Sequence, residues 1–200
     1  MRDHRAELEA IIRADPDLMR ILRLLREFAL PQGRLVAGAI YQTVWNQLCA
    51  LPRGTGIKDF DLIYFDEDVS YEAEDAVIRK VAAAAGGFRF PVEIRNQARV
   101  HLWYGQRFGG HYPKLASADQ SLSLYAATAH AVGASLEADD RIDIIAPFGL
   151  DDIFDMILRR NPALPASASY GEKARRAKAI WPRLRVVEEA ALGALPSPAT

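Results

Sequence analysis

Apolar residues recur at helical spacing near the start of the chain. Residues 5–29 predict two helices, because apolar positions in the second half of this segment follow one another at intervals of three and four. These positions are Leu18, Ile21, Leu22, Leu25 and Phe28. Asp15 followed by Pro16 is typical of a helix start, where aspartate caps the first amides and proline occupies the first turn.

The rest of the pattern predicts strands and helices in alternation. Strands are expected just before 38, over 58–68, over 88–96, and as a hairpin of 130–136 with 141–146. Helices are expected over 40–49, 70–85, 98–104, around 122–127, over 149–159 and over 172–181. Residues 161–169 read as a loop and 190–200 as a frayed tail. This order is typical of an α/β protein.

Length and composition restrict the class of protein. At about 150 residues per domain, 200 residues predict one domain, with N-terminal helices over 1–30, a sheet core over 31–148 and C-terminal helices and tail over 149–200. The formal net charge of −1 argues against a uniformly basic nucleic-acid binder. Cys49 is a single cysteine and forms no intramolecular disulfide. With no apolar stretch approaching a membrane span or signal peptide, we expect a cytoplasmic protein without a membrane partner.

Two aspartates begin the strand expected over 58–68. Asp59 and Asp61 lie on the same face, roughly 6.5 to 7 Å apart at Cα, because side chains alternate along a strand. Two carboxylates on one partly buried face repel each other unless a cation lies between them. Mg²⁺ suits this position, because it prefers oxygen ligands and keeps coordination places for phosphate and water. The alternative is a pair of solvated acids at a sheet edge.

Two further features point to phosphate chemistry. Gly38 lies between a short strand and a helix, so the amides near Gly38 and Ala39 can face a phosphate. Glu93 is an acid between apolar neighbours on the next expected strand; its alternative is an exposed strand glutamate. The sequence contains no P-loop, no dinucleotide fingerprint and no Ser-His-Asp or Cys-His set.

A glycine at a strand-to-helix turn, Asp-x-Asp on a strand and one acid on a later strand resemble the signature of the DNA polymerase β nucleotidyltransferase superfamily. Five strings resemble, in wording and order, a bacterial group called nucleotidyltransferase family proteins, over roughly residues 20–185. They are AGAIYQTVWN (37–46), DFDLIYFD (59–66), VEIRNQARVHLWY (92–104), APFGLDDIF (146–154) and KAIWP (178–182).

The resemblance implies a nucleotidyltransferase fold, which is a mixed β-sheet packed by helices. It also implies two Mg²⁺ ions and transfer of a nucleoside monophosphate from a nucleoside triphosphate to an acceptor hydroxyl, with release of pyrophosphate. By motif, Asp59 and Asp61 bind metal and triphosphate, and Glu93 is the third acid, on the metal that activates the acceptor. The backbone at Gly38 and Ala39 contacts the phosphates. The acceptor is left open between RNA, a protein and a small alcohol.

The sequence departs from the superfamily after the glycine. Serine or a second glycine usually follows, whereas Ala39 offers an amide and no hydroxyl. Arg34, Arg53 and Lys58 flank the motifs and are candidates to hold the terminal phosphate instead. The departure also leaves room for a second class of function, a nucleotide- or RNA-binding sensor that keeps the fold without transfer. A third class is a structural partner protein without metal dependence.

Two groups of residues outside these motifs are also candidates. The wording N-Q-A-R-x-H places Asn96 and His101 close to Glu93, where they could contact ribose or phosphate; alternatively, Asn96 caps the next helix and His101 packs beneath Trp103. A basic helix near the end of the chain could touch RNA or a nucleotide, or could be a solvated face. Its cations and those that follow are Lys173, Arg175, Arg176, Lys178, Arg183 and Arg185.

Overall fold

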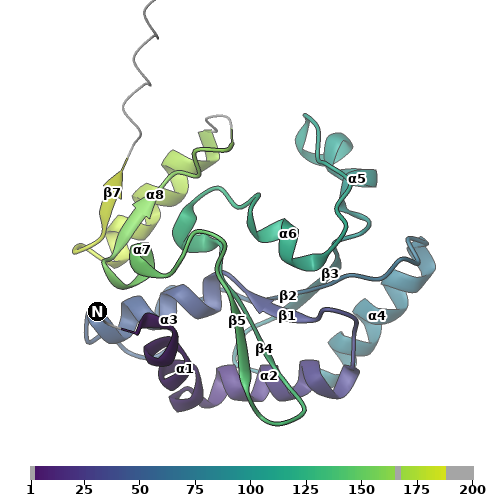
Figure 1. Cartoon of the computed structure of the whole chain (residues 1–200), viewed down its shortest axis with the longest axis horizontal. Helices are drawn as coiled ribbons and strands as arrows, with labels where there is room; N and C mark the ends of the chain where they lie inside the picture. The colour runs from purple at the N-terminus through teal and green to yellow at the C-terminus, as the bar shows by residue number, and fades with distance from the viewer. Residues whose placement is uncertain (1–2, 165–167, 188–200) are drawn as a thin grey trace, which may run out of the picture.

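The computed structural model describes residues 3–164 and 168–187 (Figure 1). The helices are α1 (His4–Ala14), α2 (Pro16–Phe28), α3 (Gly38–Leu48), α4 (Tyr71–Ala84), α5 (Val100–Phe108), α6 (Ala118–Leu122), the 3-10 turn η1 (Thr128–His130), α7 (Asp151–Phe154) and α8 (Ala168–Ile180). The strands are β1 (Arg34–Val36), β2 (Phe60–Tyr64), β3 (Val92–Asn96), β4 (Gly133–Leu136), β5 (Ile142–Ile145), β6 (Ile157–Arg159) and β7 (Arg185–Val187).

The described residues form a mixed five-stranded sheet in the order β3-β2-β1-β4-β5. β2 and β3 are parallel, and the other neighbouring pairs are antiparallel. The register of β2 against β3 pairs Asp61 with Glu93 and Tyr64 with Asn96. Paired residues on neighbouring strands share a face, so this register brings the third acid beside the aspartates.

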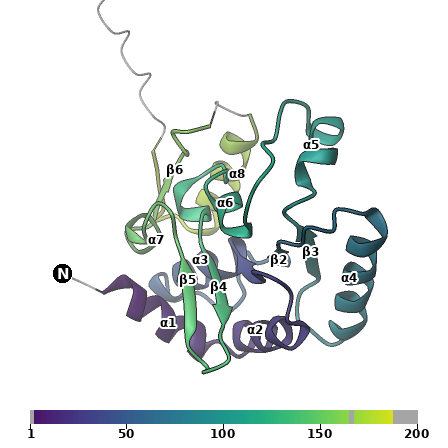
Figure 2. The same cartoon turned by 45° about the vertical axis from the view of Figure 1, so that its right-hand side comes forward.

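Alternation along β2 separates the core from the site. Phe60, Leu62 and Tyr64 are buried in the main core with residues of α1 and α2. Ile63 points to the opposite face, where it joins a smaller cluster with Val36 of β1 and residues of α6. Figures 1 and 2 show α1 and α2 on one side of the sheet and α5, α6 and α8 on the other. The second face is therefore the one that Asp61 shares with Ile63.

The expected helix starts are confirmed where a capping side chain marks them. Asp15 accepts hydrogen bonds from the amides of Asp17 and Leu18 at the start of α2, and Ser70 accepts one from the amide of Ala73 in α4. The hairpin is also confirmed, since β4 and β5 pair across residues 137–141. The strand expected over 58–68 is shorter, and β2 covers its middle.

The helix expected over 149–159 is wrong. α7 ends at Phe154, and β6 begins at Ile157 after Met156, which has a positive φ of 53°. β6 pairs with β7, a strand that the apolar pattern did not reveal. The two strands lie far apart in sequence, so their pairing leaves no local signal. The expected tail over 190–200 lies outside the described residues.

Candidate active site

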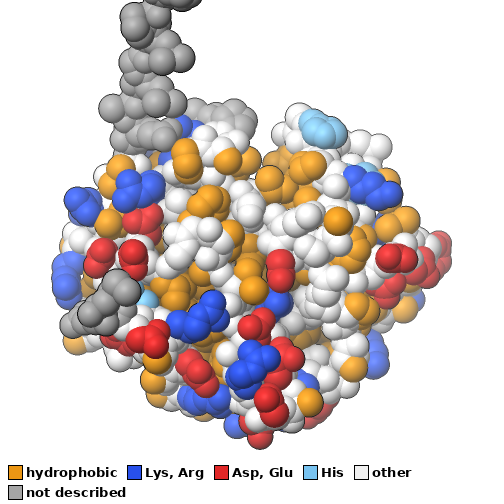
Figure 3. Space-filling view, viewed as in Figure 1, with side chains coloured by type: hydrophobic (Ala, Val, Ile, Leu, Met, Phe, Trp, Pro, Cys, Tyr) orange, Lys and Arg blue, Asp and Glu red, His pale blue; other side chains and the backbone are white. Residues whose placement is uncertain are grey.

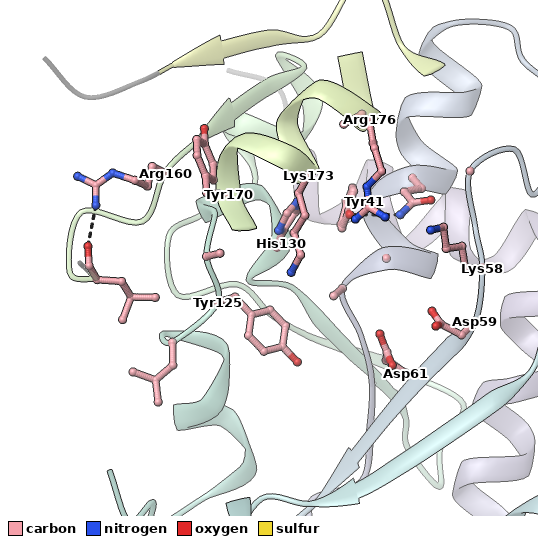
Figure 4. A pocket seen from close by; sticks show the side chains of 18 of the residues that line it. Tyr41, Lys58, Asp59, Asp61, Tyr125, His130, Arg160, Tyr170, Lys173 and Arg176 are labelled. Atoms are coloured by element: carbon pink, nitrogen blue, oxygen red, sulfur yellow. Dashed lines mark hydrogen bonds between the residues drawn. The ribbon is translucent and has the colours of Figure 1, made fainter. Parts of the chain in front are cut away.

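A cavity of about 980 Å³ opens on the second face of the sheet. The surface is notched there between α8 and α5 (Figure 3), and Figure 4 shows the side chains that point into the hollow. Of the residues that line it, the acids are Asp59 and Asp61, and the Lys and Arg side chains are Lys58, Arg160, Lys173 and Arg176. A volume of this size is enough for a ligand of several hundred daltons.

The two aspartates carry negative charge where it is poorly solvated. Burial raises the pKa of Asp61 to about 6, and the charges of Asp59 and Glu93 contribute to the rise. Burial and the charge of Glu93 also raise the pKa of Asp59. The three carboxylates are therefore close enough to repel one another. The positive charge nearby is too small to offset the free energy that their ionisation costs.

Glu93 lies beside the aspartates without closing a metal site. Its side chain is 57% exposed and lies 3.8 Å from the guanidinium of Arg95. Across residues 3–164 and 168–187, no three His, Cys, Asp or Glu side chains are grouped so as to hold a metal ion. The three-carboxylate metal centre expected from the sequence is thus not assembled in this side-chain arrangement, because mutual repulsion and Arg95 favour an outward Glu93.

Neutralising Asp61 should stabilise the fold. Since the folded-state pKa of Asp61 is raised, its ionisation destabilises the protein as pH rises from the usual aspartate range, near 3.8, to about 6. We expect Asp61→Asn to raise the melting temperature by roughly 2–6 °C at pH 8 in metal-free buffer, and by less at pH 4. Thermal melts of this variant beside the exposed Asp155→Asn control measure the effect. A lower melting temperature for Asp61→Asn at pH 8 would contradict it.

The turn from β1 into α3 borders the cavity. Ala37 and Gly38 line it, and Ala37 has φ 55° and ψ −112°, a conformation rare for a residue with a side chain. No side chain caps α3. The amides of Ile40 and Tyr41 donate hydrogen bonds to the carbonyl of Ala37. Among the first amides of this helix, those of Gly38 and Ala39 have no such bond within the described residues. These two amides suit an anion, although the Ala39 side chain is buried.

Of the flanking cations expected to hold phosphate, the structure places only Lys58 in the cavity lining. Arg34 is paired with Asp119 and lies 3.0 Å from Asp143. Arg53 lies 3.5 Å from Asp17, on α2. Neither arginine lines the cavity, so the structure gives no support to the prediction that they hold a terminal phosphate.

Asn96 and His101 lie elsewhere. Asn96 is 1% exposed, and its amide group bonds to the backbone of Asp66 and to the amide of Ala98. Asn96 therefore ties the end of β3 to the loop after β2 and holds the turn before α5, but it does not cap that helix, which begins at Val100 with no side-chain cap. His101 is half-buried on α5 and does not line the cavity. In β3, Asn96 lies opposite Tyr64, three positions beyond the level of Glu93 and Asp61, so closeness in sequence did not give closeness to the acids.

Sequence reasoning missed several cavity residues. The ring of Tyr41 stacks on that of His130 at 4.8 Å, and both line the cavity. Burial, with the nearby charge of Lys173, lowers the pKa of His130 to about 3, so this imidazole is neutral. The phenol of Tyr125 points toward Asp61 in Figure 4, and burial and the charge of Asp61 raise its pKa. Tyr41 lies one helical turn after Gly38, which is the one local signal among them.

A family model described as nucleotidyltransferase matches residues 23–186, most of the chain. The chain belongs to this nucleotidyltransferase family. The nucleotidyltransferase is similar to a solved NMR structure described as revealing a CCA-adding enzyme head domain, with 25% identity and a TM-score of 0.73. That match covers 92% of this chain and 96% of the other. The α/β nucleotidyltransferase fold expected from the sequence is confirmed, and the protein is an enzyme of the transferase class.

A second solved structure supports the fold of the nucleotidyltransferase alone. It is a CCA-adding enzyme in complex with CTP, at 15% identity and a TM-score of 0.51, and this chain covers 43% of it. A search of curated proteins gives no match. No described helix of the nucleotidyltransferase is long and apolar enough to cross a membrane.

Proposed function

We propose that this nucleotidyltransferase transfers a nucleoside monophosphate from a nucleoside triphosphate to an acceptor hydroxyl, with Mg²⁺ held by Asp59 and Asp61. One observation carries the proposal: both aspartates open into a cavity whose opposite wall supplies Lys173 and Arg176. Carboxylates for a divalent cation and free cations for phosphate are the two requirements of phosphoryl chemistry. The likeness to a CCA-adding enzyme head domain supports a nucleotide as the donor.

The donor set fits Mg²⁺. The raised pKa values of Asp59 and Asp61 mark a place where added positive charge is favourable. Mg²⁺ commonly binds one or two carboxylates together with substrate phosphates, so two preplaced aspartates suffice until the nucleotide arrives. Glu93 is paired with Asp61 in the strand register, so its carboxylate could contribute a third ligand. When bound, Mg²⁺ would neutralise charge on the phosphates and acidify the acceptor hydroxyl.

The residues of the chain have separable roles in the proposed reaction. The acceptor oxygen bonds to the α-phosphorus, while the bond from that phosphorus to the bridging oxygen breaks and pyrophosphate leaves. The amides of Gly38 and Ala39 would hold phosphate oxygens, because the start of α3 carries no side-chain cap. A carboxylate near the acceptor, Asp61 or Glu93, would take up the hydroxyl proton.

Nucleotide binding and pyrophosphate release test the proposal. ATP, CTP, GTP and UTP are titrated with Mg²⁺ by calorimetry, and each is then incubated with total RNA, protein or small metabolites while pyrophosphate is measured. We expect at least one nucleotide to bind, with binding weakened in Asp59→Asn/Asp61→Asn, and pyrophosphate to appear with one acceptor pool. Binding without pyrophosphate in every pool would favour the sensor, the second candidate that Ala39 suggests. No binding would reject both.

A further inference from the structure

Two cations on α8 face the aspartates across the cavity. Lys173 and Arg176 are three residues apart, so they project from one side of the helix, and both line the cavity. Figure 4 shows them on the wall opposite Asp59 and Asp61, with Lys58 near the aspartates. Arg175, on the same helix, does not line the cavity. Lys173 and Arg176 are exposed side chains that also line the cavity, so the structure is compatible with both a ligand contact and a solvated face for them.

Neither α8 cation is paired with an acid. The side chains of Lys173 and Arg176 make no salt bridge or hydrogen bond with the residues that the structure describes. By contrast, several arginines near the surface are paired, such as Arg99 with Glu74 and Arg159 with Asp152. Lys173 attracts Asp61 across the cavity and counteracts part of the rise in the pKa of that carboxyl, but the two side chains form no direct ion pair, so the ammonium group stays available to a ligand anion.

The position of α8 is fixed by packing. Trp181 directly follows the helix, is 2% exposed and donates a hydrogen bond of 2.9 Å from its indole N–H to Asn46 of α3. Gly56 lies against the same ring: a Cβ there would come within 2.5 Å of the Trp181 ring. Because Gly56 is in the loop that leads to Lys58, this contact holds the α8 cations at a set position relative to the start of β2.

We propose that Lys173 and Arg176, with Lys58, form the site for the polyphosphate end of the nucleotide, whose two outer phosphates leave as pyrophosphate. This inference rests on the proposed function, because that function supplies the nucleotide whose phosphates would bind here. Arginine binds two phosphate oxygens at once and lysine contributes a point charge, so the pair suits a flexible polyanion. These cations supply contacts to the terminal phosphate, whereas Ala39 has no hydroxyl with which to make them.

Inorganic tripolyphosphate tests this site without any transfer reaction. Its dissociation constant is measured by calorimetry in metal-free buffer for the wild type, Lys173→Gln/Arg176→Gln and the matched control Arg175→Gln. We expect the double variant to bind at least tenfold more weakly, a loss that corresponds to about 1.4 kcal/mol, and the control to bind within twofold of the wild type. Thermal melts confirm that each variant is folded. Arg176→Lys alone should keep a larger part of the affinity than Arg176→Gln.

Two results would overturn the assignment. One is no tripolyphosphate binding by the wild type, and the other is equal losses of tripolyphosphate affinity in the double variant and the Arg175→Gln control. These outcomes are separate from failure of the proposed function, because tripolyphosphate binding is measured without acceptor or metal.

Discussion

Replacing Asp59 and Asp61 together by asparagine is expected to lower nucleotidyl transfer by at least ~10³-fold, the largest effect that we predict. Asparagine keeps the size of the side chains and removes both negative charges. Mg²⁺ would then meet neutral amide oxygens, which bind it more weakly than carboxylates, and the charge on the transferring phosphate would be left without a counterion. The rate of pyrophosphate release at saturating nucleotide and Mg²⁺ measures the loss.

Stability separates a chemical role of the aspartates from a structural one. Because repulsion and burial raise the pKa values of both groups, the double variant should melt at or above the wild-type temperature while it is inactive. Asp155→Asn, on the surface after α7, is the matched control and should keep full activity. Retention of more than a tenth of the wild-type rate by the double variant would contradict the assignment of Asp59 and Asp61.

Trp181→Ala is expected to cost about 3–5 kcal/mol of unfolding free energy, the largest stability effect among our predictions. The Trp181 ring packs edge-on against Trp45 at 5.2 Å and against Gly56, and its removal also leaves the Asn46 side-chain oxygen without its indole donor. Urea unfolding measures the free energy. Nucleotide affinity should fall as well, because α8 loses the contact that positions Lys173.

A variant of an exposed apolar residue provides the comparison. Leu102 on α5 is 50% exposed, so Leu102→Ala should change the unfolding free energy by no more than about 0.5 kcal/mol. If Trp181→Ala costs as little as Leu102→Ala, α8 is not held to the body of the protein by this ring. The fixed placement of the α8 cations would then lose its physical basis.

The acids could be found from the sequence because their signals are local. Alternation over a few residues predicted that Asp59, directly before β2, and Asp61, within β2, share one face, and a glycine between strand and helix marked the start of α3. That Glu93 lies beside Asp61 follows only from the pairing of β2 with β3, which the sequence does not give. The sequence pattern could identify Glu93 as a candidate, but it could not predict the orientation of the Glu93 side chain, which lies near Arg95.

The opposite wall of the cavity could not be read from local pattern. In the sequence, Lys173 and Arg176 look like any exposed basic residues on a helix. Their place beside the cavity depends on the packing of Trp181 against Asn46, 135 residues away in the chain. The same limit applies to β6, since Leu158 is fully buried and suits a helix or a strand equally well until its partner β7 is known. Asn96 is the opposite case. It lies near the motif in sequence and was predicted to contact the ligand, but its side chain accepts a hydrogen bond from the amide of Ala98 and holds a turn.

A crystal structure with Mn²⁺ and a non-hydrolysable nucleoside triphosphate tests the central claim most directly. We predict anomalous density for Mn²⁺ between Asp59 and Asp61, in contact with phosphate oxygens, and the outer phosphates directed toward Lys173 and Arg176. Bound nucleotide with its phosphates outside this cavity, or metal density away from both aspartates, would contradict the account.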